Sequence, residues 1–497
     1  MENDKDAIPM QILENDFDYE LTPHKKLRKP YFSPKFILFV IFTLSILLVF
    51  FFIYHSYTIK QLNNKIDQLE SRINTMDKEV ARRKIGVAFV YDYMYANGIA
   101  RFLTVLTDLL AETGKYHVYL INEGATEIDF KLNRKVKRII TKMDTQQMVD
   151  VDHSNNIDIY ILNNDASKDY IDTYRSLGKK VIGIFHGVYL SCIFTNDTDA
   201  YPLWADFNYF DSFVHIIPDD YWVYKKFGFN NTIYVPNIYT FDTTKVPTSP
   251  LTHKNILMVG RVDDIIKGGR FGILAMSEIL KEIPDAKLTI VGLNPPDDLI
   301  NLTYELNIDK SVIWANFSLN ISEHYLNTSV LLVTSVSESF PMVMNEGKAH
   351  SVPIVSFNVD YSPCFQKGVI TVEMFDYKAM AKETIKLLND FDYRKKMGEI
   401  AKESLKMYNN NDTINLWGKV FNALVNEKDE YKKLQEEVEK QYYNETAAKE
   451  RLVKHFHYGQ QFNKFFKCHS FENFTSLDYI QTIESCPDPT KSSKKKF

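Results

Sequence analysis

The pattern of apolar and polar residues divides the chain into a short N-terminal section and a long alternating one. Residues 36–54 carry no charge, and a seam of apolar residues spaced three and four apart follows them. From residue 84 onward, short apolar runs alternate with longer segments of helical periodicity. Such alternation of strands and helices predicts parallel sheets covered by helices.

The charge-free run at residues 36–54 is long enough to cross a bilayer. As a helix it would extend about 28 Å, which suits a bilayer on the thin side. A cleaved signal peptide is the alternative, but a long segment precedes the run and no small-x-small cleavage site follows it at residues 54–56. Basic residues crowd its N-terminal side, so the positive-inside rule predicts a cytosolic tail at residues 1–35 and a single-pass type II signal anchor.

The apolar seam that follows predicts a helical stem over residues 55–83. Spacings of three and four residues alternate along it, which is the pattern of a short coiled coil. Such a stem would hold two copies of the chain in a parallel homodimer. A solitary amphipathic helix is the alternative at this length. The seam consists of Ile59, Leu62, Ile66, Leu69, Ile73, Met76 and Val80.

Sequons for N-glycosylation favour a lumenal location for the bulk of the chain. This composition would give roughly four N-x-S/T sequences by chance, and the chain has more than that. We therefore expect the membrane of the endoplasmic reticulum or Golgi, with everything after the anchor in the lumen; a cytosolic location is the alternative. The sequons begin at Asn196, Asn230, Asn301, Asn316, Asn320, Asn327, Asn411, Asn444 and Asn473.

Length and composition exclude several classes of protein. With 497 residues the chain is too long for one ordinary core, and two or more domains are expected. It is 45% hydrophobic and 25% charged with a formal net charge of −5, so there is no basic excess to bind nucleic acid. The four cysteines form no CxxC or zinc pattern, although Cys468 and Cys486 could close a loop in an oxidising lumen.

Two α/β domains are predicted after the stem. The first covers residues 84–245 and the second residues 253–425, and a segment rich in Thr, Ser and Pro at residues 239–252 links them. Residues 426–497 form a helical and irregular extension in which we find no chemistry. The strands expected in the first domain are residues 85–90, 116–121, 157–162 and 180–185.

Two candidate site residues follow strands of the first domain. Gly98 comes in the turn after the first strand, and His186 comes directly after the strand at residues 180–185. In parallel sheets the reactive groups lie beyond the carboxyl ends of the strands, which makes both residues candidates. A plain turn glycine and a structural histidine are the alternatives.

The most informative stretch is residues 330–357. An apolar strand, a polar turn, a helix and a second apolar strand follow one another there. Pro341 suits the first helical position, where no backbone donor is lost. The free amides of Met342 and Val343 would then point out of the helix N-terminus toward an anion.

Two glutamates flank this predicted anion site. Glu338 lies in the turn and Glu346 about a turn and a half into the helix, with seven residues between them. A carboxylate repels phosphate, but it accepts hydrogen bonds from the hydroxyls of a sugar or ribose beside the phosphate. Both features together fit a nucleotide sugar; two unrelated surface glutamates are the alternative.

With these residues the chain resembles a known family. The sequence E-S-F-P at residues 338–341, followed by Glu346, resembles the E-x7-E element of retaining GT-B glycosyltransferases, especially glycosyltransferase family four. The pairs G-R at 260–261 and K-G at 267–268, followed by P-D-A-K-L-T-I-V-G at 284–292, resemble a second pattern of that family. Solvated surface cations are the alternative for Arg261 and Lys267.

The resemblance implies a role for each candidate residue. Two cations would neutralise the departing diphosphate of the donor without a metal. One glutamate would bind the ribose, and the other, with the backbone beside it, the donor sugar. The donor-binding residues so implied are Arg261 and Lys267 for the diphosphate, Glu346 for the ribose, and Gly260, Phe340, Pro341, Met342, Val343 and Gly98 around them, and the catalytic ones are Glu338 and His186.

The resemblance also implies a fold and an activity. The fold would be GT-B, with two Rossmann-like domains facing across a cleft. The activity would be retaining transfer of a sugar from a UDP- or GDP-linked donor to a glycan, glycolipid or glycoprotein acceptor, with no cofactor or metal. A DxD-like sequence at residues 197–199, the metal clamp of the unrelated GT-A enzymes, is discounted because it overlaps a sequon. A catalytically inactive GT-B protein that binds or scaffolds is the alternative.

Overall fold

The structure is a computed structural model in which the chain forms two compact units, residues 1–83 and residues 84–497. Each unit is described by itself. The residues that the structure describes are 33–92, 94, 97–124, 130–163, 168–187, 209–226, 228–262, 267–293, 295–359, 367–407, 409–426, 428–450 and 453.

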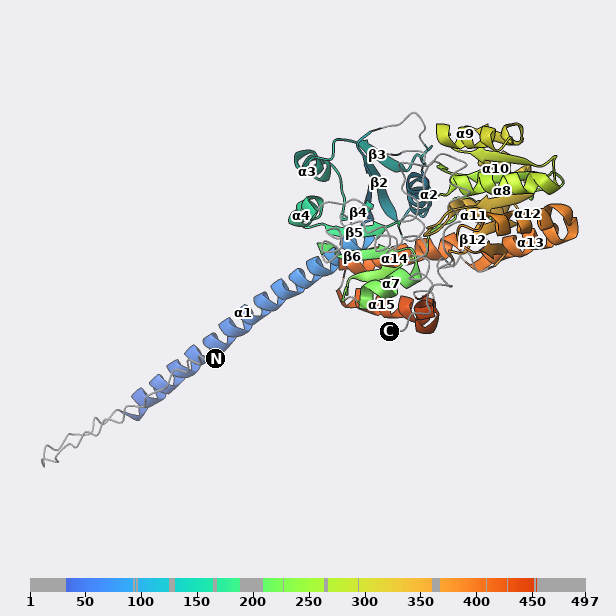
Figure 1. The fold of residues 1–497 in the computed structure, drawn as a ribbon. Helices are drawn as coiled ribbons and strands as arrows, with labels where there is room; N and C mark the ends of the chain where they lie inside the picture. Colours follow the sequence, from blue (N-terminus) through green and yellow to red (C-terminus); the bar gives the residue numbers. More distant parts are fainter. Residues whose placement is uncertain are drawn as a thin grey trace, which may run out of the picture. The chain divides into compact units, whose positions relative to one another are not determined.

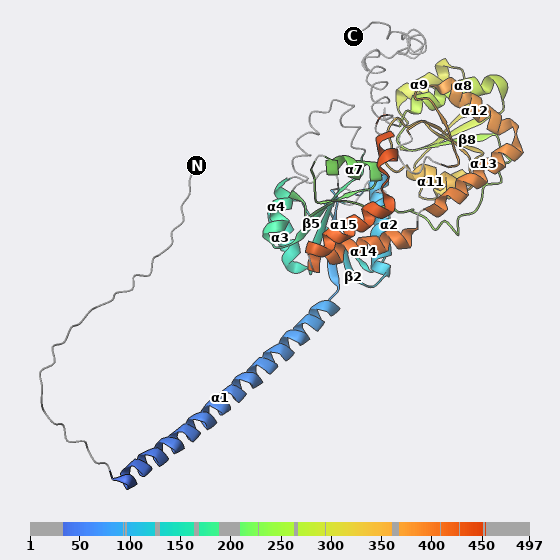
Figure 2. The same ribbon diagram turned by 90° about the horizontal axis from the view of Figure 1, so that it is seen from below.

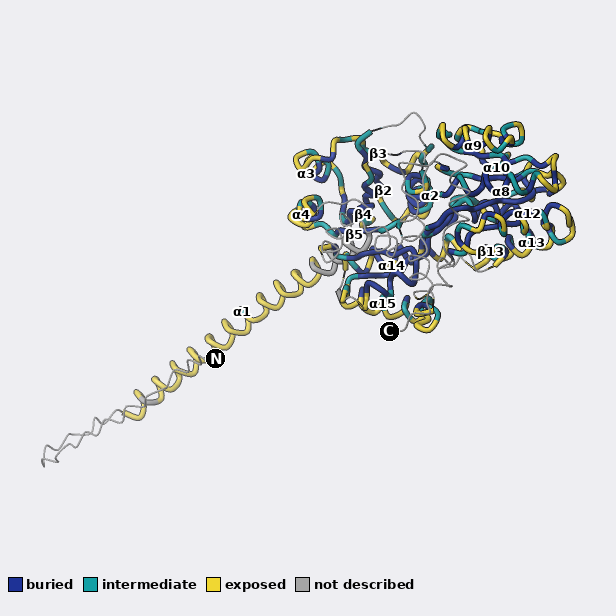
Figure 3. Tube along the Cα trace, in the orientation of Figure 1, coloured by how far each residue is buried: buried dark blue, intermediate teal, exposed yellow. Residues whose placement is uncertain are grey.

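One helix, α1 (Pro34–Arg82), makes up the described part of the first unit. It runs without a break through the predicted membrane span and the predicted stem to residue 82, and Figure 3 colours almost all of its described residues as exposed. Residues 34–72 are long and apolar enough to cross a membrane, by length and composition. The coiled coil stays a prediction, because the side chains at 73–82 lie outside the described ones.

Two parallel sheets organise the second unit (Figure 1). The first sheet has the strand order β3-β2-β1-β4-β5-β6-β7 and the second β10-β9-β8-β11-β12-β13, so each domain has a Rossmann-like topology in which the first strand lies inside the sheet. The strands are β1 (Ile85–Val90), β2 (Tyr116–Asn122), β3 (Val136–Ile140), β4 (Ile159–Asn163), β5 (Lys180–Phe185), β6 (Ser212–His215), β7 (Thr232–Tyr234), β8 (Asn255–Val259), β9 (Lys287–Val291), β10 (Val312–Ala315), β11 (Val330–Val333), β12 (Ile354–Phe357) and β13 (Val369–Val372).

Helices accompany the strands of both domains, and several of them connect one strand to the next, as the crossovers of a parallel sheet require. In the first domain they are α2 (Gly98–Glu112), α3 (Thr145–Ser154), α4 (Lys168–Ser176) and α7 (Pro218–Lys226). In the second they are α8 (Gly269–Glu282), α9 (Asp297–Glu305), α10 (Ile321–Leu326), α11 (Met342–Ala349), α12 (Tyr377–Asn389) and α13 (Phe391–Ser404). The expected fold of two Rossmann-like domains is confirmed.

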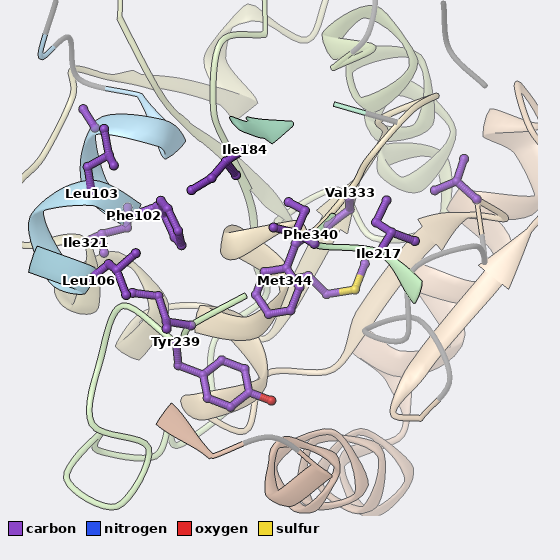
Figure 4. Close-up of a cluster of buried hydrophobic side chains, with 14 of the residues drawn as sticks. Phe102, Leu103, Leu106, Ile184, Ile217, Tyr239, Ile321, Val333, Phe340 and Met344 are labelled. Atoms are coloured by element: carbon purple, nitrogen blue, oxygen red, sulfur yellow. The ribbon is translucent and has the colours of Figure 1, made fainter. Parts of the chain in front are cut away.

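Buried side chains from both domains pack together between the sheets. Figure 4 shows one such cluster, to which α2 contributes Phe102 and α11 contributes Met344, with Tyr239 from the segment that joins the domains. All three side chains are buried. The two domains therefore share a packed interface at the level of α2 and α11.

The last helices return to the first domain. Both ribbon views show α14 (Asn410–Asn426) and α15 (Lys428–Tyr442) beside the first sheet (Figures 1 and 2). Trp417 of α14 is 1% exposed and meets the ring of Phe89 edge to face, and Phe421 does the same with Tyr116. The Tyr431 hydroxyl of α15 lies 2.6 Å from Ser212 Oγ on β6. The helical part of the C-terminal extension is therefore a structural layer of the first domain.

Replacing Trp417 by Ala should destabilise this layer. Deleting a fully buried indole is expected to cost about 3–5 kcal/mol of the free energy of unfolding, measured by urea titration of the full-length chain in detergent and followed by circular dichroism. Tyr304, which is 61% exposed, offers a control in Tyr304→Ala; that change should stay within about 0.5 kcal/mol. Equal effects of the two substitutions would contradict the packing role of α14.

Candidate functional site

A cleft of about 760 Å³ lies at the carboxyl ends of the strands of both sheets. Its lining combines the loop and first turn after β1 and the end of β5 with the turns after β8, β9 and β11. The structure thus brings every predicted site residue into one place. The predicted residues in the lining are Gly98, His186, Gly260, Arg261, Lys267, Glu338, Phe340, Pro341, Met342, Val343 and Glu346.

The second domain presents the N-terminus of α11 to this cleft. Pro341 is the N-cap, so the helix begins at Met342, one residue later than predicted. The amides of Met344 and Asn345 both donate to the Pro341 carbonyl, whereas Met342 and Val343 belong to the first turn, which has no acceptor within its own helix. Together with the helix dipole, these two amides form a site that favours an anion.

Glycines shape the two loops that carry the predicted cations. Gly260 has φ 136°, a backbone conformation that favours glycine, and its carbonyl oxygen would lie 2.3 Å from a Cβ on Gly292. Gly268 has φ 61°, and a Cβ there would lie 2.4 Å from the carbonyl oxygen of Thr334. Arg261 directly follows one of these glycines, and Lys267 directly precedes the other. Both cations line the cleft.

Lys267 and Glu338 form an ion pair within the cleft. Lys267 Nζ lies 2.6 Å from Glu338 Oε1, and the side chains are 31% and 8% exposed. The Thr334 hydroxyl donates to the Lys267 carbonyl at 2.7 Å, which joins the loop before α8 to the turn after β11. The residue predicted to bind the diphosphate, Lys267, and the residue predicted to bind the sugar, Glu338, are thus direct neighbours.

Glu346 is the most buried charged group of the site, with its side chain 4% exposed. Arg101 Nη1, from the first turn of α2, lies 2.7 Å from Glu346 Oε1, and the Tyr325 hydroxyl donates to Oε2 at 3.2 Å. Burial raises the pKa of Glu346, and Arg101 and Tyr325 oppose that rise. The carboxylate is therefore held by a cation from the other domain.

Sequence reasoning missed Arg101. The sequence does contain an indication of it, because Arg101 lies one helical turn after Asn97-Gly98. A helix that begins at this turn directs its first side chains toward the same strand ends as Gly98. The residue was not singled out because a lone arginine on an amphipathic helix is usually a solvated surface charge.

His186 lies half-buried at the end of β5, in contact with both domains. Asn163 Nδ2 donates to the Val90 carbonyl, so Asn163 Oδ1 faces the ring and accepts from His186 Nε2 at 2.9 Å. Burial lowers the pKa of the His186 ring to about 3, so the ring is neutral near pH 7. Its backbone carbonyl accepts a hydrogen bond from Ser339 Oγ of the second domain at 2.6 Å.

Gly98 begins α2 at the point where the two domains approach each other. Asn97 caps the helix by accepting from the Ala100 amide at 2.8 Å, which turns the helix N-terminus toward the cleft. A Cβ on Gly98 would lie 3.6 Å from Met342 Sδ, which is ordinary contact. The N-termini of α2 and α11 thus both border the cleft.

Some predicted features lie outside the described residues. The DxD-like sequence at residues 197–199 and the four cysteines are among them. Within the part of the chain that the structure describes, no group of three or more His, Cys, Asp or Glu side chains could hold a metal ion. Independence of metal stays a prediction.

Comparison with known proteins agrees with this architecture. Residues 241–404 match the model of the family described as Glycosyl transferases group 1. Over 155 residues, 30% of the chain, the sequence is 31% identical to N-acetyl-alpha-D-glucosaminyl L-malate synthase of Bacillus anthracis, and it covers 39% of the length of that protein. The chain therefore spans less than half of this curated relative.

Solved structures superpose on about two thirds of the chain. Sucrose-phosphate synthase from Thermosynechococcus elongatus superposes with a TM-score of 0.57 at 15% identity, over 69% of this chain and 99% of that one. The Alr3699/HepE protein of Anabaena, in complex with UDP and glucose, gives a TM-score of 0.56 at 12% identity, over 68% and 100%. The chain has the GT-B fold.

Protonation of His186 should contribute to acid sensitivity. Because its pKa is about 3 in the folded chain and near 6.5 in the unfolded chain, the unfolded state binds more protons between these values. Stability should fall as pH decreases through 6.5, by up to about 1.4 kcal/mol per pH unit from this group. In urea titrations at pH 7, 6 and 5, His186→Gln should show a shallower decline than wild type.

Exposed His253 provides the matched control for this experiment. His253→Gln should decline with pH as wild type does. If His186→Gln and His253→Gln have equal slopes, the ring of His186 does not carry the predicted effect.

Proposed function

We propose that this chain, with its GT-B fold and a second domain that matches the glycosyl transferases group 1, is a retaining glycosyltransferase that uses a nucleotide sugar. The observation that carries the proposal is the composition of one cleft wall. Arg261 and Lys267 lie there with the first amides of α11 and the carboxylates of Glu338 and Glu346. Cations and amides suit a diphosphate, and carboxylates suit the hydroxyls on either side of it.

Donor binding would redistribute the ion pair between Lys267 and Glu338. The diphosphate of the donor offers Lys267 a stronger negative partner, and Glu338 is then free to accept hydrogen bonds from the hydroxyls of the donor sugar. Arg261 and the amides of Met342 and Val343 would share the phosphate charge, and Glu346 would take the ribose hydroxyls. Fixed donors of this kind stabilise a departing diphosphate without a metal ion.

The first domain would supply the acceptor side of the cleft. A hydroxyl of a glycan, glycolipid or glycoprotein attacks the anomeric carbon from the face that the diphosphate leaves. The new bond forms between the acceptor oxygen and the anomeric carbon, the bond from that carbon to the phosphate oxygen breaks, and the acceptor proton passes to a phosphate oxygen. His186, neutral and held by Asn163, would contact the donor sugar near this point.

Substitutions on the cleft wall should remove activity. We expect a screen of UDP- and GDP-sugars with the full-length protein to find release of nucleoside diphosphate, unaffected by EDTA. Arg261→Ala and Glu346→Ala should lower that release by about 10²–10³-fold, the usual cost of losing a group that stabilises the transition state. Once an acceptor is found, proton NMR of the product should show the anomeric configuration of the donor.

Arg175 of α4 is an exposed arginine outside the cleft lining, so Arg175→Ala is the control and should keep full activity. Equal background release by wild type and the two cleft variants would favour an inactive GT-B protein that binds or scaffolds. Inversion of configuration, or loss of release in EDTA, would refute the corresponding part of the mechanism.

We also propose that α1 anchors the enzyme in the membrane of the endoplasmic reticulum or Golgi, with both domains in the lumen. The charge-free segment of α1 and the basic residues before it support this orientation. The described sequon asparagines support it too, because each is exposed and open to modification. They are Asn230, Asn301, Asn316, Asn320, Asn327, Asn411 and Asn444.

Glycosylation tests the orientation directly. In a eukaryotic cell, the lumenal orientation should give the protein a mass that falls on digestion with an endoglycosidase. Asn411→Gln and Asn444→Gln should each lower the mass of the undigested protein by one glycan, on gels run beside wild type. A mass that endoglycosidase leaves unchanged would place the domains in the cytosol.

A further inference from the structure

The salt bridge between Arg101 and Glu346 joins the first domain to the donor side of the cleft. Arg101 belongs to α2 and Glu346 to α11, and their charged atoms lie 2.7 Å apart. The arginine side chain is 29% exposed and borders the cleft, whereas the glutamate is almost completely covered. Both residues line the cleft, and the protein around the glutamate covers most of its side chain.

Arg101 is the charged partner of the carboxylate, whereas Tyr325 is a neutral one. Tyr325 has a single hydroxyl proton, and its oxygen lies closer to the Val343 carbonyl, at 2.9 Å, than to Glu346 Oε2, at 3.2 Å. A cation 2.7 Å from an ionised carboxylate stabilises its charge more than a shared neutral hydroxyl does. Removal of Arg101 would leave a buried carboxylate without its counter-charge, which is strongly unfavourable.

The position of Arg101 depends on the approach of the two domains. Two further contacts cross between them beside this pair: Ser339 Oγ donates to the His186 carbonyl, and Gly98 lies against Met342. All three contacts gather around the N-terminus of α11. Moving the domains apart would separate Arg101 from Glu346.

We propose that Arg101 is a positioning residue of the donor site. It holds the carboxylate of Glu346 ionised and oriented, so that the oxygen lone pairs left by Arg101 and Tyr325 accept the ribose hydroxyls of the nucleotide. Donor recognition by the second domain then requires a side chain of the first. This inference rests on the proposed function, in which Glu346 takes the ribose.

Selectivity for ribose over deoxyribose measures this role. The probes are UDP and 2′-deoxy-UDP, and GDP with 2′-deoxy-GDP, bound to the full-length protein in detergent and followed by calorimetry. UDP is the first choice because the Anabaena protein of the same fold has been crystallised with UDP. Loss of one hydroxyl bonded to a carboxylate should weaken binding to wild type about tenfold.

Arg101→Met keeps the length of the side chain and removes its charge. In this variant the ratio of the two dissociation constants should fall to about 1–2, as it should in Glu346→Gln, because the oriented carboxylate is lost in both. Arg101→Lys keeps the positive charge but replaces the guanidinium fork by a single ammonium group. This variant should therefore show a ratio of dissociation constants between those of Arg101→Met and wild type. Because each dissociation constant is independent of the fraction of folded protein, partial misfolding does not change the ratio.

Arg175→Met is the matched control and should retain the wild-type ratio. A wild-type ratio in Arg101→Met, or equal weakening of both nucleotides there, would overturn the role of Arg101 and leave the proposed function standing. Absence of a ribose preference in wild type would overturn it as well. If wild type binds neither UDP nor GDP, the proposed function itself fails.

Discussion

A buried carboxylate must find a positive partner within the protein, and the partner of Glu346 comes from the other domain. The pair lies where the first turn of α2 meets the second turn of α11. Other contacts between the domains gather at the same point: Ser339 donates to the backbone carbonyl of His186 there, and Gly98 lies beside Met342. The cleft is therefore bounded by the same residues that hold its walls together.

The charge of the described cleft lining suits an anionic ligand. Three cations, Arg101, Arg261 and Lys267, stand against two carboxylates, Glu338 and Glu346, which leaves one positive charge. The N-termini of α2 and α11 add partial positive charge at the same edge of the sheets. Both carboxylates are already paired with cations, which reduces their repulsion of an incoming diphosphate. Exposed Arg261 and the helix amides can then attract it.

Much of this arrangement could be predicted from sequence because it depends on local rules. The buried strand β11, the turn after it and Pro341 at the start of α11 specify an anion site over a few consecutive residues. The glycines at 260 and 268 predict turns, and these turns keep the adjacent cations, Arg261 and Lys267, near the ends of the strands. Strand β3 was not predicted because Lys137 and Arg138 interrupt its apolar pattern at the edge of the sheet, and β6 was missed because its four residues begin with a serine and end with a histidine.

The pairings within the site could not be predicted in the same way, because they join residues far apart in the chain. Nothing local to residue 101 indicates that its partner is residue 346, and nothing local to Lys267 indicates Glu338. The positions of these residues in the sequence predict only that each lies near the carboxyl end of a strand. Only the approach of the two domains decides which cation meets which carboxylate.

The chain crosses between the domains twice, and the two crossings are bonded to each other. The Tyr239 amide donates to Asn410 Oδ1 at 2.8 Å, and Asn410 Nδ2 donates back to the Tyr239 carbonyl at 2.7 Å. The Tyr239 hydroxyl also donates to the Leu405 carbonyl, and its ring centroid lies 6.3 Å from that of Phe340, at the start of α11. The two crossings therefore pack directly against the donor side of the cleft. Because Arg101 and Glu346 belong to different domains, a rotation of one domain against the other about these crossings would change the distance between their charged atoms while it left each sheet intact.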